Sequence, residues 1–148
     1  KGTLYRQTMF AEFELKMGEL VQAGVPLTAA KLCEEYRKLN ELYFGPDMVC
    51  DDRIAMEWAR IPHFYYNYYV FQYATGYSAA IALSQKILKE GQPAVEKYLE
   101  FLSGGRSKPP VDLLKGAGVD MSSPEPVNEA LALFGRLLDE MEQLAEEL

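Results

Sequence analysis

Hydrophobic residues recur every three or four positions along most of this chain, which is the spacing of an amphipathic helix. The first run covers residues 4–23 and is followed by Gly24, a residue type common at helix ends. Similar runs predict further helices at residues 29–44, 51–58, 62–90, 93–102, 110–114 and 127–148. No segment alternates convincingly with the period of two that strands show. The pattern therefore predicts an all-α chain.

Residues at the edges of these runs supply starts and stops for the helices. Thr28 stands where its hydroxyl can cap the helix over residues 29–44, and Gly45 and Pro46 follow as stop signals. Pro62 is tolerated in a first helical turn, so the tyrosine-containing helix is predicted to begin there. The apolar row within residues 131–144 is expected to dock the last helix onto the body of the chain.

Composition limits which binding partners and which cellular location we expect for this chain. The chain has 148 residues, 49% hydrophobic and 25% charged, so residues 1–148 are expected to form a single helical unit. A net charge of −7 without a basic stripe argues against nucleic acid as a partner. No apolar run approaches the roughly 20 residues of a membrane span, so no membrane is expected either. Two cysteines without a disulfide framework favour a reducing, cytoplasmic location.

Residues 63–77 contain six of the ten tyrosines and the single histidine, His63. A buried tyrosine hydroxyl is costly without a hydrogen-bond partner, so this density indicates a polar surface prepared for a ligand. On a helix, one narrow stripe would contain Tyr65, Tyr69, Tyr73 and Gly76, with Tyr66 and Tyr77 beside it. The absence of a side chain at Gly76 would let a bound peptide approach closely. The alternative is that these rings are ordinary core aromatics.

Several separated segments carry a family resemblance. Residues 51–76 contain His-Phe-Tyr, then an aromatic pair, then Tyr-Ala-Thr-Gly. The other matching segments are residues 5–14, 43–47, 78–83, 101–105 and 113–121. Together they resemble oligoendopeptidase F, of the M3 (thimet oligopeptidase-like) zinc metallopeptidases, over essentially the whole chain.

The resemblance implies a metalloendopeptidase that cleaves short oligopeptides inside a nearly all-helical channel. In such enzymes zinc polarises the scissile carbonyl and activates water, with a glutamate as general base. The resemblance assigns oxyanion stabilisation and substrate holding to His63, Tyr65 and Tyr69. It adds Tyr66 and Tyr73 as substrate contacts, to which the helical stripe adds Gly76.

The zinc-binding motif of that family, His-Glu-x-x-His with a downstream glutamate, is absent from this sequence. One histidine cannot supply two imidazole ligands. We therefore expect the zinc ligands to precede Lys1, and we expect no metal ligand on this chain. The chain thus resembles the C-terminal part of the catalytic domain, expected to be inactive alone and to self-associate through apolar surface. Two alternatives remain open, a non-catalytic peptide-binding module and a purely structural helical bundle. Glu12 and Glu14 are expected on solvated helix faces.

Overall fold

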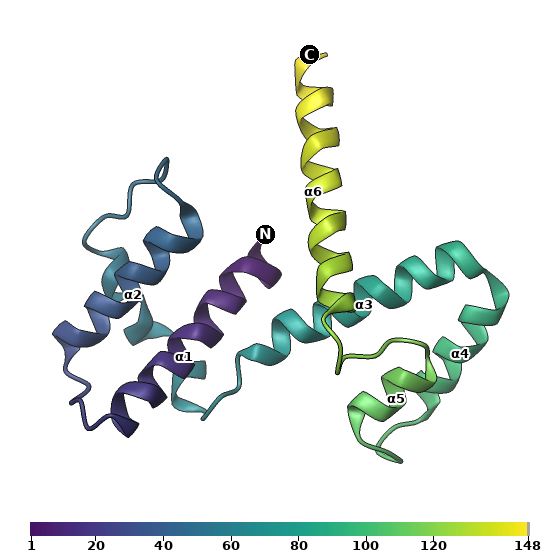
Figure 1. Ribbon diagram of the computed structural model, residues 1–148, viewed down its shortest axis with the longest axis horizontal. Helices are drawn as coiled ribbons and strands as arrows, with labels where there is room; N and C mark the ends of the chain where they lie inside the picture. The colour runs from purple at the N-terminus through teal and green to yellow at the C-terminus, as the bar shows by residue number, and fades with distance from the viewer. Residues whose placement is uncertain (148) are drawn as a thin grey trace. The chain divides into compact units, whose positions relative to one another are not determined.

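The computed structural model describes residues 1–147, which are largely helical and contain no strand (Figure 1). This agrees with the predicted all-α class. The contacts divide the chain into two compact units, Lys1–Ala74 and Thr75–Leu148, here called unit 1 and unit 2. The expectation that residues 1–148 form a single helical unit stays a prediction.

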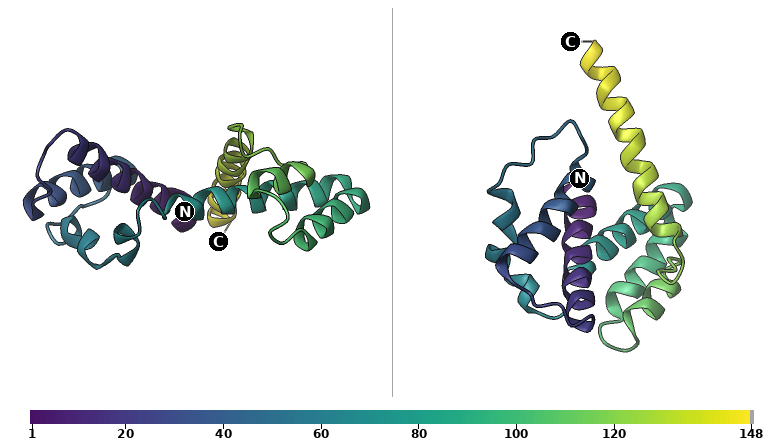
Figure 2. Two further views of the ribbon diagram at one scale, coloured as in Figure 1. Left: turned by 90° about the horizontal axis from the view of Figure 1, so that it is seen from below. Right: turned by 60° about the vertical axis from the view of Figure 1, so that its left-hand side comes forward.

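Unit 1 is built on two helices that lie side by side and run in opposite directions (Figures 1 and 2). A π-helical segment, η1 (Gly2–Arg6), leads into α1 (Gln7–Gln22), and α2 (Ala29–Phe44) follows. Their apolar faces form one core together with Ile61 and Val70, which lie before and after η3. Its buried members are Met9, Phe10, Phe13, Leu32, Tyr36, Leu39, Ile61 and Val70. Burial of each large apolar side chain there contributes about 1.5–3 kcal/mol to folding, so this core is the main source of stability of unit 1.

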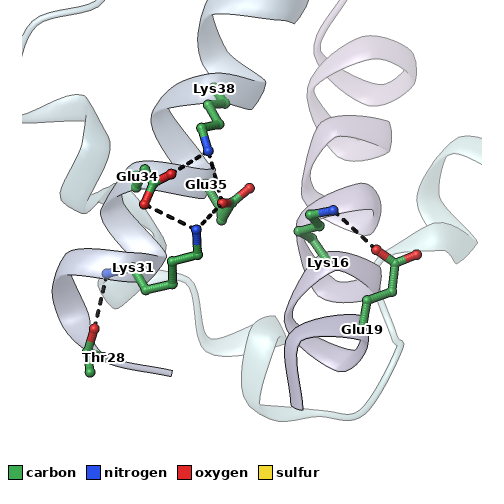
Figure 3. Close-up of polar contacts among 7 residues, drawn as sticks. All are labelled: Lys16, Glu19, Thr28, Lys31, Glu34, Glu35 and Lys38. Carbon is green, nitrogen blue, oxygen red and sulfur yellow. Dashed lines mark hydrogen bonds and ion pairs between the residues drawn. The ribbon is translucent and has the colours of Figure 1, made fainter. Parts of the chain in front are cut away.

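The start and end of α2 are where the sequence predicted them. The Thr28 hydroxyl accepts a hydrogen bond from the Lys31 backbone N–H at 3.2 Å, as Figure 3 shows. Gly45 ends the helix with φ of 78°, a conformation that glycine adopts without steric cost. Along α2, Lys31 and Lys38 pair with the exposed Glu34 and with the buried Glu35 (Figure 3).

The helix predicted at residues 51–58 is a 3₁₀-helix, η2, that covers Ile54–Arg60. The Asp51 carboxylate accepts hydrogen bonds from the backbone N–H groups of Arg53 at 2.8 Å and Ile54 at 3.1 Å. Asp51 therefore forms the turn before the helix instead of lying in its first turn. Within η2, the indole N–H of Trp58 donates to Sγ of Cys33 at 3.5 Å.

The single tyrosine-rich helix predicted from Pro62 to residue 90 is wrong. The 3₁₀-helix η3 covers only Pro62–Tyr65, and α3 begins later, as Phe71–Glu90. Residues 66–70 between them are not helical. The helix is interrupted because Asn67 and Tyr68 both have positive φ, 52° and 59°.

Unit 2 contains most of α3 together with three further helices. These are α4 (Gln92–Ser103), α5 (Pro110–Gly116) and α6 (Glu125–Glu146), and α4 and α5 lie side by side (Figure 1). Gly91, with φ of 69°, separates α3 from α4. The buried core of this unit is small and consists of Ala79, Ala82, Leu83, Ala117 and Val119.

The last helix differs from its prediction in packing. The buried residues of α6 are Pro126 and Ala130, both near its start. Its apolar row is exposed at Leu131, Leu137, Leu138, Met141 and Leu144. The predicted docking of this row is wrong, because α6 packs through its first turns only. The predicted continuation to residue 148 lies outside the described residues.

Among the described residues, none of the helices is both long enough and apolar enough to cross a bilayer.

Candidate active site

The five residues between η3 and α3 form a loop, residues 66–70, that is attached to α1 of unit 1. The backbone N–H of Val70 donates to Oε2 of Glu14 at 3.0 Å, and that of Tyr69 donates to Oε1 at 3.4 Å. The Glu14 side chain is buried on α1, with its residue only 5% exposed. Buried carboxylates require such donors, and two backbone N–H groups satisfy this one.

Four aromatic rings gather where this loop leaves η3 and enters α3. The ring of Tyr69 stacks on His63 with centroids 5.3 Å apart and planes 8° from parallel. Tyr66 and Tyr73 meet the same imidazole edge-on, at 5.8 and 5.5 Å. The hydroxyl of Tyr73 lies 3.0 Å from Nε2 of His63. We call His63, Tyr66, Tyr69 and Tyr73 the His–Tyr cluster.

The surroundings of Tyr73 favour its uncharged phenol. Partial desolvation of Tyr73, together with the neighbouring Tyr69 hydroxyl, raises the pKa of Tyr73 above its ordinary value. Where the Tyr73 hydroxyl donates to Nε2 of His63, the imidazole proton is on Nδ1. Such an imidazole can itself donate from Nδ1. The cluster therefore offers donors for an oxygen that gains charge.

Two residues expected at the site lie outside this cluster. Tyr65 ends η3 and is 69% exposed, with no ring contact among the described residues. Gly76 lies within α3, and a Cβ added there would meet only open space. The structure thus brings together four of the six predicted site residues. The predicted stripe on one helix face is wrong, because a loop replaces the expected helix at residues 66–70. The aromatic rings nevertheless lie close together.

The tyrosines of the His–Tyr cluster are not fully buried, although Tyr73 also packs against the core of unit 1. Tyr69 is 39% exposed, Tyr66 is more exposed, and Tyr73 is half-buried. The buried apolar residues of the segment are Ile61 and Val70, which face the core of unit 1. This arrangement disfavours the purely structural bundle that the sequence left open.

No three His, Cys, Asp or Glu side chains gather as metal ligands within the part of the chain that the structure describes. Both cysteines are free and His63 is engaged with Tyr73. The donor set of this chain therefore does not fit a zinc site, which in proteins needs three or four such ligands.

Sequence reasoning missed two buried carboxylates of unit 1, of which Glu14 contacts the site loop and Glu57 lies outside the site. Glu14 was expected on a solvated face, yet it lies between the buried Phe13 and the half-buried Met17 on the apolar side of α1. Glu57 is 8% exposed and accepts hydrogen bonds from Arg6 at 2.6 Å and from the Tyr36 hydroxyl at 2.8 Å. Helical spacing was the available signal, because each acidic residue falls among apolar neighbours.

Unit 1 contains two sizeable cavities, of which one borders the loop of residues 66–70. One of about 370 Å³ is bounded by Asn67 and Tyr68 of the loop and by Glu14 and Gly18 of α1. A larger one of about 720 Å³ lies beside η2, with Cys50, Asp51 and Arg53 among its lining residues. We place the candidate site at the His–Tyr cluster, because donor chemistry converges there and the larger cavity is mainly apolar.

Known proteins are similar to this chain in sequence and fold. Residues 1–133 match the family model of Peptidase family M3. Oligopeptidase PepF of Bacillus subtilis (strain 168) is 60% identical over 144 residues, covering 97% of this chain and 22% of that protein. The plasmid oligoendopeptidase F of Lactococcus lactis subsp. cremoris is 45% identical over 146 residues, covering 99% of this chain and 24% of that protein.

A crystal structure of oligoendopeptidase-F from Enterococcus faecium matches this chain with a TM-score of 0.96 and 50% identity. The match covers the whole of this chain and 28% of that one. The fold and the sequence define an all-helical segment that matches part of known peptidases. The chain belongs to Peptidase family M3, and within it is similar to oligoendopeptidase F. It spans about a quarter of the length of these relatives.

Proposed function

We propose that this chain is the C-terminal part of the catalytic domain of a zinc metalloendopeptidase that hydrolyses short oligopeptides. The observation that carries the proposal is the His–Tyr cluster, in which Tyr69 stacks on His63 and Tyr73 is hydrogen-bonded to it. The names of the relatives, oligopeptidase and oligoendopeptidase, support peptides as the substrate class.

In this proposal the cluster forms one wall of the site. His63 and Tyr69 donate hydrogen bonds to the oxyanion that develops at the scissile carbonyl, and Tyr66 and Tyr73 hold the peptide. Tyr65 and Gly76 contact substrate only if the bound peptide extends beyond the four clustered rings. The zinc ligands lie in sequence preceding Lys1, and we place the protein in the cytoplasm.

A direct test uses the full-length protein that contains this chain, with a quenched fluorescent oligopeptide as substrate. We expect cleavage that a chelator abolishes and zinc restores. Tyr69→Phe should lower kcat by roughly 100-fold, the usual cost of removing one oxyanion donor. Tyr98→Phe is the matched control, because it removes a hydroxyl in unit 2, where Tyr98 stacks on Phe101.

The same assay separates the alternatives. Residues 1–148 alone should show no cleavage, and chelator-sensitive cleavage by this fragment would contradict the proposal. Peptide binding by the full-length protein without any cleavage would favour the non-catalytic binding module. An unchanged kcat for Tyr69→Phe would remove Tyr69 from the oxyanion role, and Tyr65→Phe would then be the next variant.

A further inference from the structure

We infer that Glu14 and Gly18 of α1 are positioning residues that hold the His–Tyr cluster in its reactive arrangement. They do so by fixing the loop of residues 66–70. This inference rests on the proposed function, because it concerns the wall that the proposal assigns to substrate.

The loop has a conformation that its own sequence does not favour. Left-handed backbone is unfavourable for an L-residue, and two consecutive residues adopt it here. Asparagine tolerates that region, but Tyr68 has no such advantage. Contacts from outside the loop must therefore hold Asn67 and Tyr68 in place.

Glu14 supplies the first of these contacts. Both of its carboxylate oxygens accept backbone N–H groups, those of Tyr69 and Val70. These groups directly precede the first residue of α3, so the carboxylate lies at the positive end of that helix. One carboxylate thus fixes the backbone of Tyr69 and the start of the helix whose first turn carries Tyr73.

Gly18 supplies the second contact, one helical turn along α1 from Glu14. A Cβ added to Gly18 would lie 1.9 Å from the hydroxyl oxygen and 3.1 Å from Cζ of Tyr68. The ring of Tyr68 therefore lies directly against the α1 backbone, in space that any side chain at position 18 would occupy. The same face of α1 thus contacts the loop twice: the Glu14 carboxylate accepts its backbone N–H groups, and Gly18 leaves space for the Tyr68 ring.

The geometric consequence reaches the reacting groups. Tyr69 is one of the two residues that Glu14 fixes, and Tyr73 follows three residues after the other, Val70; both tyrosines contact His63. Release of Tyr69 and Val70 would let both rings shift on the imidazole. Misplacement of a catalytic group by about 1 Å can cost a hundredfold in rate.

The experiment uses the full-length protein and two measurements. Glu14→Gln replaces one acceptor oxygen with a donor, so it cannot accept both N–H groups. We expect kcat to fall at least tenfold with a smaller change in KM, and deuterium exchange in residues 66–72 to accelerate at least tenfold. Glu19→Gln is the matched control on α1, since Glu19 is exposed and paired only with Lys16 (Figure 3).

A second variant pair keeps the inference testable if Glu14→Gln accelerates exchange throughout the protein. Alanine normally stabilises a helix relative to glycine, but here Gly18→Ala should lower kcat at least tenfold. Adding Tyr68→Phe removes the atom nearest the new methyl group. We expect this to restore most of the rate, measured against Tyr68→Phe alone.

Three outcomes would overturn the inference. One is wild-type exchange in residues 66–72 of Glu14→Gln, and another is an equal effect of Glu19→Gln. The third is a failure of Tyr68→Phe to rescue Gly18→Ala. If the unmodified protein cleaves no peptide, the proposed function fails, while the exchange measurement still decides whether Glu14 fixes the loop.

Discussion

At the scale of single residues, the most consequential group outside the site is the carboxylate of Glu57. Burial alone would raise its pKa, but hydrogen bonds from Arg6 and Tyr36 hold the pKa below the ordinary value of 4.5. Arg60 pairs with the same carboxylate. Tyr36 lies in α2, Glu57 in η2 and Arg6 in η1, so this network joins these three elements. The ring of Tyr36 is fully buried in the core.

Glu57→Gln should therefore destabilise the protein by about 1–3 kcal/mol at pH 7, since it removes the charge that two arginines share. A carboxyl with a lowered folded-state pKa stabilises above its unfolded pKa and loses that contribution as pH falls through the folded pKa. The difference between wild type and variant should thus be constant from pH 6 to 7 and shrink below about pH 4.5.

Urea unfolding at several pH values measures this difference. Glu41→Gln on the exposed side of α2 provides a control that should leave stability nearly unchanged. A gap for Glu57→Gln that widened in acid would contradict the assignment of a lowered pKa.

At the scale of elements, the clearest local determinant is the cap of α2. Thr28→Ala removes the acceptor for the Lys31 N–H and should cost about 1 kcal/mol of unfolding free energy. Thr28→Ser keeps the hydroxyl and should stay close to wild type. Urea midpoints of the two variants compare them directly, and equal midpoints would mean that the cap contributes nothing.

Elements were predictable from the sequence where their determinants are local. Thr28, Gly45 and Gly91 mark helix ends that the structure confirms within one or two residues. The interruption at residues 66–70 was not predictable, because its partner Glu14 lies more than 50 positions away. An Asn-Tyr pair within an apolar period gives no local sign of left-handed backbone.

The candidate site was predictable in membership but not in geometry. The density of tyrosines around His63 correctly indicated the four clustered rings, because residues close in sequence stay close in space on a compact backbone. The helical stripe failed for Tyr65 and Gly76, since η3 ends at Tyr65 and α3 begins only at Phe71. The positioning role of Glu14 required knowledge of which side chain is buried against the loop.

At the scale of the whole molecule, the exposed row on α6 predicts self-association of the 148-residue chain. Apolar side chains at Leu137, Met141 and Leu144 recur at helical spacing on one side of α6 and are more than half exposed. Such rows in soluble proteins are usually covered by another surface. We expect sedimentation to show a concentration-dependent rise in mass.

Leu137→Glu with Met141→Glu should return the chain to a monomer. A variant with Asn128→Asp and Gln143→Glu adds the same charge to α6 at exposed polar positions and should still associate. A single monomer at all concentrations for the unmodified chain would contradict the prediction.

The contact between Trp58 and Cys33 gives unit 1 an optical reporter of its own. Trp58 is the chain's single tryptophan, so its emission reports the surroundings of η2 and α2 within unit 1. Ellipticity in the far ultraviolet, by contrast, sums helices from both units. Recording the two signals on one sample can therefore show whether the two halves of the chain melt as one cooperative body or in succession.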